Sequence, residues 1–165
     1  MEHITFEVHD HVGTITLNRP EKLNAVTPEM SDALVEHVTQ WNRRDDIHCL
    51  VLLAAGEKAF CAGSDVKELN QYKTPWEFRN RPDYCDAIRS LAKPIVCAIN
   101  GYALGGGLET AMSCDIRIAA DTAVLGAPEV KLGWIGGGGM AYMLAHSAGA
   151  SNASMMLMTG DFITA

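Results

Sequence analysis

Residues 100–109 read NGYALGGGLE and place three consecutive glycines between a hydrophobic run at 94–99 and a helical pattern at 108–114. The run predicts a buried strand, and glycine at the turn lets a ligand approach the main chain. A helix start exposes N–H groups and partial positive charge, which attract negative charge. Glu109, in the first helical turn, is instead suited to proton transfer. Together these residues indicate chemistry at a carbonyl group, although a tight strand-to-helix turn with a carboxylate facing the helix dipole would give the same pattern.

Strand and helix patterns alternate on both sides of this turn. Period-two alternation at 4–8 and 12–17 predicts a hairpin, and Thr27 with Pro28 predicts the start of a helix that runs to about Asn42. Residues 71–83 are polar and are expected to form a mobile surface segment, and Thr164 resembles a helix N-cap with no helix after it. The remaining patterns predict strands at 49–54, 94–99, 115–120 and 123–126, and helices at 66–70, 84–92, 108–114, 140–146 and 151–158. This alternation indicates an α/β fold with parallel strands.

Composition and charge exclude several classes of partner. The 165 residues are expected to form one domain, 1–165, and the net charge of −7 argues against nucleic acid or an acidic membrane surface as a partner. No apolar run reaches the roughly 18 residues of a membrane span, and the first residues lack a signal-peptide pattern. The five cysteines are odd in number and lack CxxC spacing, which is typical of reduced thiols in a cytoplasmic protein. The six histidines show no metal-ligand spacing, so no metal site is expected.

Three loops carry residues suited to chemistry: FCAGSD at 60–65, the glycine run ending at Glu109, and APEVKLG at 127–133. In this order they resemble the enoyl-CoA hydratase/isomerase (crotonase) superfamily. The match continues through LNRPEKLNA at 17–25, KP at 93–94, NG at 100–101, CD at 114–115 and MTGD at 158–161, so it covers the whole chain. The resemblance implies a spiral of ββα units and a coenzyme A thioester as ligand, with no separate cofactor.

The resemblance also implies which residues bind the thioester. Its oxygen would accept hydrogen bonds from the backbone N–H groups of Ser64 and Gly106, an oxyanion hole in which each donor contributes roughly 3–4 kcal/mol. Lys22 and Lys67 would contact the phosphates of coenzyme A, or would be solvated lysines. The full set implied for coenzyme A and substrate binding is Lys22, Leu23, Ala25, Ala62, Ser64, Asp65, Val66, Lys67 and Gly106.

Glu109 and Glu129 match the two positions that hydratases of this superfamily use for acid–base chemistry. One glutamate would draw a proton from water as it adds to the β-carbon, and the other would help deliver a proton to the α-carbon. Two carboxylates near one apolar pocket repel each other, which raises the pKa of at least one toward neutral pH. The presence of both favours hydration over double-bond isomerisation, although Glu129 could also be only a loop carboxylate that follows Pro128.

The sequence departs from the common pattern in two places. Residues 134–142 read WIGGGGMAY, so Gly136 replaces a proline and a Thr-Gln-Arg element is missing. The shape of the acyl pocket, and hence the acyl group of the substrate, is therefore not determined. Trp134 and Tyr142 could line the acyl pocket or belong to the core. Members of the superfamily usually continue into C-terminal helices that cover the site and build a trimer. The sequence therefore predicts a truncated core domain, and a homo-oligomer, trimer or hexamer, if the full interface is present.

Three alternative functions stay open at this point. An isomerase, or a dehydratase of an unusual acyl-CoA, is suggested by the altered glycine loop, and a catalytically silent acyl-CoA-binding fragment is suggested by the missing region. A nucleotide-binding Rossmann domain is disfavoured because the glycines do not keep the Gly-x-Gly-x-x-Gly spacing.

Overall fold

The computed structural model describes residues 2–165, and its strands form two sheets. In spatial order, the first sheet consists of β1 (Ile4–His9), β2 (Val12–Leu17), β3 (Cys49–Ala54), β5 (Ile95–Ile99) and β7 (Ile116–Ala119). The second consists of β4 (Ala59–Cys61), β6 (Tyr102–Leu104), β8 (Val124–Gly126) and β9 (Phe162–Thr164). Only the β1–β2 and β8–β9 pairs are antiparallel among the described strands, so the expected parallel arrangement is confirmed.

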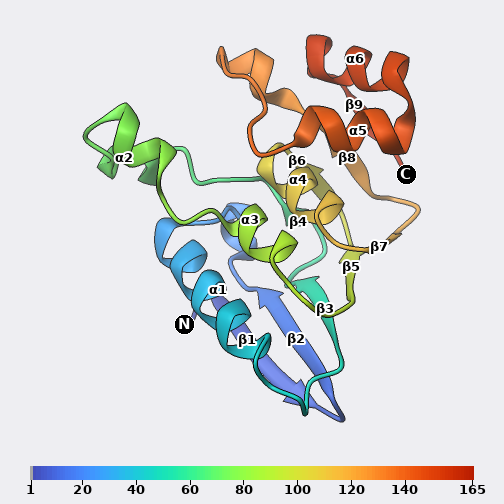
Figure 1. Ribbon diagram of the computed structural model, residues 1–165. Coiled ribbons are helices and arrows are strands. Elements are labelled where there is room, and N and C mark those ends of the chain that lie inside the picture. Colours follow the sequence, from blue (N-terminus) through green and yellow to red (C-terminus); the bar gives the residue numbers. More distant parts are fainter. Residues whose placement is uncertain (1) are drawn as a thin grey trace.

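Helices connect the strands in a regular order. The α-helices are α1 (Pro28–Trp41), α2 (Pro75–Arg79), α3 (Tyr84–Arg89), α4 (Gly106–Met112), α5 (Met140–Ala148) and α6 (Ala150–Thr159). Short 3₁₀ helices are η1 (Pro20–Lys22), η2 (Glu68–Gln71) and η3 (Pro128–Leu132). The pairs β3/β4, β5/β6 and β7/β8 each give their first strand to the first sheet and their second to the second sheet, and each pair is followed by one or more helices. This is the spiral of ββα units that the resemblance implies (Figure 1).

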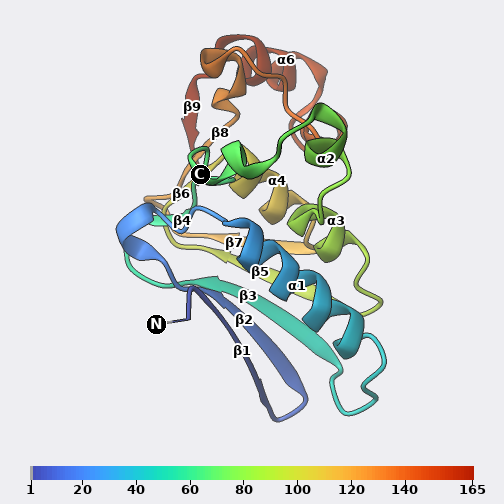
Figure 2. The same cartoon turned by 90° about the vertical axis from the view of Figure 1, so that its left-hand side faces the viewer.

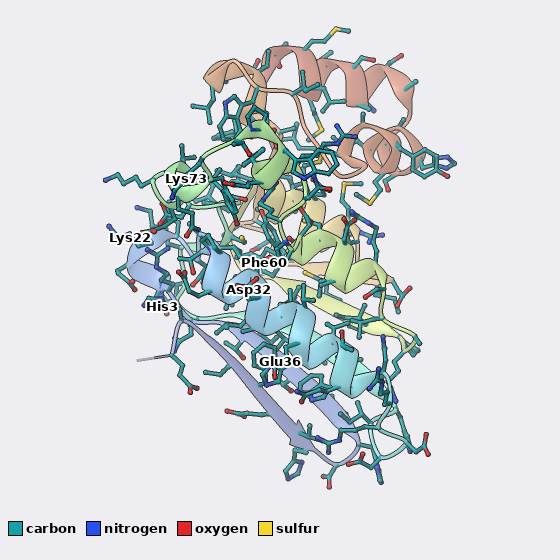
Figure 3. The ribbon with its side chains drawn as sticks, turned by 60° about the vertical axis from the view of Figure 1, so that its left-hand side comes forward. His3, Lys22, Asp32, Glu36, Phe60 and Lys73 are labelled. Atoms are coloured by element: carbon teal, nitrogen blue, oxygen red, sulfur yellow. The ribbon has the colours of Figure 1, made fainter. Side chains whose placement is uncertain are left out.

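The core lies between the first sheet and the helices that cover it. The buried apolar residues of α1 recur at helical spacing and belong to one cluster with buried residues of β2, β3 and β5; they are Met30, Leu34, Val38 and Trp41. Phe60 of β4 is fully buried in the same cluster (Figure 3). Burial of this apolar area stabilises the fold by about 25 cal/mol per Å².

Helix α4 lies between this core and a second, smaller one. Ala111 belongs to the main cluster, whereas Leu108 packs with Met140, Leu144 and Met156 of α5 and α6. Helices α5 and α6 lie together at the end of the molecule opposite the β1–β2 hairpin, and α1 lies across the first sheet (Figures 1 and 2). Because α4 is packed on two sides, residues in its first turn are held in fixed positions.

Some expectations about local structure were wrong. Residues 71–83 lie at the surface as expected, but they also contain a short helix, α2, which begins after Thr74, whose Oγ1 accepts the N–H of Glu77 at 3.1 Å. Thr164 is not a helix N-cap: it lies in β9, opposite Val124 of β8, because strand pairing satisfies its backbone groups instead. The short strands β4 and β6 lie in segments that were expected to be loops or turns.

The cysteines and helices agree with two further expectations. All five cysteines are free thiols, and Cys61, Cys85, Cys97 and Cys114 are buried. Every helix among residues 2–165 is too short or too polar to cross a lipid bilayer.

Candidate active site

The 61–65 loop meets the start of α4, and the two segments carry the backbone N–H groups of Ser64 and Gly106. The Val26 N–H donates to Gly63 O at 2.8 Å, and the Asp65 N–H donates to Val26 O at 2.9 Å. Ser64 lies opposite Val26 in a parallel bridge, and Val26 bonds to the two neighbours of Ser64. The Ser64 N–H group therefore points away from Val26. A Cβ built on Gly63 would lie 3.0 Å from Gly106 N, so the two segments touch. The Gly106 N–H is in the first turn of α4, where it has no intrahelical acceptor.

Tyr84, the first residue of α3, lies against this pair of segments. Its buried hydroxyl is 3.0 Å from Ser64 Oγ, and a Cβ at position 106 would collide with it. Glycine at 106 is therefore required by the close approach of Tyr84. Burial raises the pKa of Tyr84 well above its usual value, which keeps the hydroxyl protonated.

Glu109 presents a buried carboxyl group in the same first turn of α4. Only 6% of the residue is exposed, and its Oε1 lies 3.4 Å from Nη1 of Arg89. Burial raises the pKa of Glu109 to about 7, with the charges of Asp83 and Glu129 acting in the same direction and Arg89 opposing them. Glu109 therefore changes its protonation state near neutral pH, which suits a group that gives and takes protons.

Glu129 lies in η3, and its carboxyl group faces the glycine turn. Its Oε1 is 3.1 Å from the position that a Cβ on Gly105 would take. Its Oε2 is buried and has no hydrogen-bond partner among the described residues. Buried carboxylate oxygens normally have a partner, so this atom is free to bind a small polar molecule. Burial raises the pKa of Glu129 as well.

The two loops expected to contact coenzyme A are joined to each other. The Ala62 N–H donates to Leu23 O at 3.0 Å, and Nη1 of Arg19 connects Ala25 O at 3.1 Å with the Asp65 carboxylate at 2.8 Å. The remaining residues of this set, Lys22, Val66 and Lys67, are exposed. Lys22 lies at the outer edge of the molecule (Figure 3). The structure thus brings these residues into one region, with both lysines accessible to an anionic ligand.

A separate groove lies away from these residues. A groove of about 360 Å³ between β1 and α1 is lined by residues that include His3, Phe6, Glu29 and His37, and it includes neither Glu109 nor Glu129. The space beside Ser64 and Tyr84 is only about 10 Å³. Neither space is lined by Glu109 or Glu129, so the candidate site is defined by its carboxyl groups with raised pKa values and by the glycine turn beside them, and not by a hollow.

Tyr84, Arg89 and Asp83 were not recognised from the sequence as site residues. All three lie in or beside α3, where an aspartate cap and mixed polar and apolar residues predict only an amphipathic helix. Their proximity to α4 depends on tertiary packing, and the sequence carries no local signal for it.

The chain is similar to proteins of one family throughout its length. The family model described as "Enoyl-CoA hydratase/isomerase" matches residues 7–165. A relative from Dictyostelium discoideum, "Probable enoyl-CoA hydratase, mitochondrial", is 40% identical over 98% of this chain and 58% of its own length. "(E)-Benzylidenesuccinyl-CoA hydratase" from Thauera aromatica is also 40% identical, over 98% of this chain and 64% of its own length.

Solved structures agree with these sequence comparisons. The crystal structure of enoyl-CoA hydratase from Bacillus anthracis superimposes with a TM-score of 0.91 at 35% identity, over 99% of this chain and 65% of that chain. The present chain therefore spans about 60% of the length of the relatives it matches. The α/β fold expected from the resemblance is confirmed, without a counterpart of the relatives' C-terminal region.

Proposed function

The chain belongs to the enoyl-CoA hydratase/isomerase family, and from that membership we propose that it adds water reversibly to the double bond of a 2-enoyl-CoA thioester. The observation that carries the proposal is the pair Glu109 and Glu129. The Glu109 carboxyl group is buried and that of Glu129 is half-buried, and both have raised pKa values. Glu129 lies against Gly105 and Glu109 against Gly138, and the charge of Glu129 helps to raise the pKa of Glu109.

The N–H groups of Ser64 and Gly106 are the proposed oxyanion hole. As water adds to the β-carbon, the electron pair of the double bond moves toward the thioester, and negative charge grows on its oxygen. Backbone N–H groups at fixed positions stabilise that charge without having to reorganise. The absence of a side chain at Gly106 leaves the main chain accessible, and the first turn of α4 adds the positive end of a helix dipole.

The two glutamates divide the proton transfers between them. One, ionised, takes a proton from the attacking water as its oxygen bonds to the β-carbon. The other, protonated, gives its proton to the α-carbon, so one C–O and one C–H bond form and the C=C π bond is lost. The pair needs one proton between its two members. The mutual repulsion that helps raise the pKa of Glu109 favours that state near neutral pH.

The proposed ligand region and partner follow from the same site. The joined 22–25 and 62–67 loops would hold the coenzyme A part, with Lys22 and Lys67 near its phosphates. For the whole protein we expect a homo-oligomer, a trimer or hexamer. Ile116 and Ile118 of β7 are apolar and are 56% and 62% exposed, which supports a subunit contact that would cover them. Five free thiols support a reducing compartment such as the cytoplasm.

The first test is the loss of enoyl-thioester absorbance when the purified chain is mixed with crotonyl-CoA. We expect Glu109→Gln and Glu129→Gln each to lower kcat by roughly 10²–10⁴-fold, because each removes one proton transfer. Glu7→Gln, at an exposed position in β1, is the matched control and should keep full activity.

Other outcomes would contradict parts of the proposal. Full activity in either site variant would remove that glutamate from the mechanism. Turnover of a 3-enoyl-CoA without hydration would indicate an isomerase. Binding of coenzyme A by calorimetry without any turnover would indicate a silent acyl-CoA-binding chain.

A further inference from the structure

We propose that Arg89 is a positioning residue that holds the Glu109 carboxyl group in place and sets the pH at which it exchanges its proton. This inference rests on the proposed function of Glu109, and it concerns a residue that does not itself touch the substrate. Arg89 is the last residue of α3, and Glu109 lies in the first turn of α4, so the contact joins two helices that are packed side by side.

The Arg89 guanidinium contacts Glu109 by two routes. Its Nη1 lies 3.4 Å from Glu109 Oε1 and donates to Ser113 Oγ at 2.9 Å. Ser113 Oγ in turn donates to the backbone carbonyl of Glu109 at 2.8 Å. One nitrogen therefore fixes the carboxyl group directly and the helix turn beneath it indirectly. The other terminal nitrogen pairs with Asp86 on α3, which anchors the guanidinium plane.

The burial of the three charged groups explains why this contact matters. The exposed fraction of the side chain is 8% for Glu109, 29% for Arg89 and 72% for Asp86. The cation thus reaches from the surface to a carboxyl group that has lost almost all of its water. A buried ionised carboxylate needs a hydrogen-bond donor, and Arg89 is the one that the described residues provide.

The charges around Glu109 are otherwise unfavourable to its ionised form. Asp83 precedes α3, and Glu129 approaches from η3; both raise the pKa of Glu109, as does burial. The thiol of Cys85 also faces this region, and the charge of Glu109 contributes to raising its pKa. Arg89 acts in the opposite direction. With Arg89 the pKa of Glu109 is about 7, so removal of the cation is expected to move it to a higher pH.

A purely structural role for Arg89 would have different consequences. Arg89 and Asp86 form an i, i+3 pair on α3, and such pairs stabilise helices slightly. If that were its whole role, removing the guanidinium would lower the stability of the chain without changing the titration of Glu109. The two roles therefore separate when the carboxyl group is observed directly.

The decisive experiment follows the ¹³C NMR signal of the Glu109 carboxyl carbon against pH, assigned by its loss in Glu109→Gln. We expect Arg89→Gln to move the midpoint upward by about one pH unit, since the pair is partly exposed to solvent. Arg89→Lys keeps the charge and should stay closer to the unmodified chain. In the pH profile of kcat/KM, the change caused by titration of Glu109 should move in the same direction as the NMR midpoint.

Two controls complete the design. Arg43→Gln removes the same charge from an exposed position beyond α1. Asp86→Asn removes the charge of the helix pair but keeps an amide oxygen that can accept from Arg89, so the guanidinium stays anchored beside Glu109. Neither should raise the midpoint. If Arg89→Gln does not fold, Arg89→Met tests the same point with an apolar chain.

The outcomes separate this inference from the proposed function. An unchanged midpoint in Arg89→Gln, or an equal shift in Arg43→Gln, would overturn the role of Arg89. A shifted midpoint in a chain that never hydrates crotonyl-CoA would support the Arg89–Glu109 contact and contradict the proposed function instead.

Discussion

The Tyr84 hydroxyl lies 3.0 Å from the Ser64 hydroxyl, and it occupies the space that a side chain at position 106 would need. Gly106→Ala is therefore expected to push Tyr84 away from Ser64 and to destabilise the chain by about 1–3 kcal/mol, the usual range for overpacking. Activity should fall as well, because the Gly106 N–H would move with its turn. Urea denaturation and the hydration assay measure the two effects.

The double variant Tyr84→Phe/Gly106→Ala tests whether the hydroxyl is the cause. Deleting the hydroxyl removes the atom that the new methyl group meets first, so the double variant should recover part of the lost stability. The ring carbon that bore the hydroxyl would still lie 3.2 Å from the methyl group, which limits the recovery. Purely additive effects of the two substitutions would show that Tyr84 is not the obstacle.

A second prediction concerns Gly138 in the glycine run before α5. A Cβ at this position, where φ is +55°, would overlap the carboxyl group of Glu109. Gly138→Ala should displace that group, and a misplacement of about 1 Å can lower turnover by roughly 10²-fold. The matched control is Gly137→Ala, because nothing lies within 4 Å of a Cβ there. Equal activities of the two variants would contradict the placement of Glu109.

Local signals in the sequence were sufficient for most of the fold. The hairpin of β1 and β2 and the cap of α1 were correctly predicted, and the Thr27 side chain does accept a hydrogen bond from the Met30 N–H. The helix after Thr74 has the same Thr-Pro signal, but it was not predicted because the residues around it are polar. Strands β4 and β6 are only three residues long, too short to show a period of two.

The site was predictable only in part. Glu109 and the glycine turn were recognised from their local pattern, the resemblance to a family then implied the roles of Gly106 and Glu109, and those roles stay predictions. Tyr84 and Arg89 reach the site from α3, and their contacts with Ser64 and Glu109 depend on how α3 packs against α4. A single sequence does not encode such long-range contacts in any local spacing.

A third prediction concerns the ion pair beneath the proposed oxyanion loop. Arg19 and Asp65 lie 2.8 Å apart, with only 9% and 14% of their side chains exposed. Asp65→Ala would leave the Arg19 cation buried without an anion, which costs about 3–5 kcal/mol in comparable pairs. Asp65→Asn retains an acceptor and should cost less. Urea denaturation of the two variants measures the difference, and equal stability of Asp65→Ala and the unmodified chain would contradict it.

The same pair predicts a sensitivity to acid. The hydrogen bond from Arg19 lowers the pKa of Asp65 below its usual value of 3.8. The folded chain therefore gains stability above that value and loses it as the pH falls toward the lowered pKa. In Asp65→Asn this acid-dependent loss should be absent.

The last prediction concerns the stability cost of the Glu109 carboxyl group. Its pKa is about 7 in the folded chain, compared with 4.5 as the ordinary value. Between these two pH values the unfolded chain loses the proton and the folded chain keeps it, so stability falls as the pH rises and is constant again above the folded pKa. Glu109→Gln cannot lose a proton, so at pH 8 it should be more stable than the unmodified chain, by an amount on the order of 3 kcal/mol.

Urea denaturation at several pH values between roughly 4 and 8 tests this relation, because that range brackets both pKa values of Glu109. The stabilities of Glu109→Gln and the unmodified chain should agree at the acidic end and separate toward pH 8. Glu7→Gln, the exposed control, should follow the unmodified chain throughout. Parallel curves for Glu109→Gln and the unmodified chain would show that Glu109 is not held with a raised pKa. A gain in stability at pH 8 together with a loss of hydration would show that the fold gives up stability to keep this proton-transferring group buried.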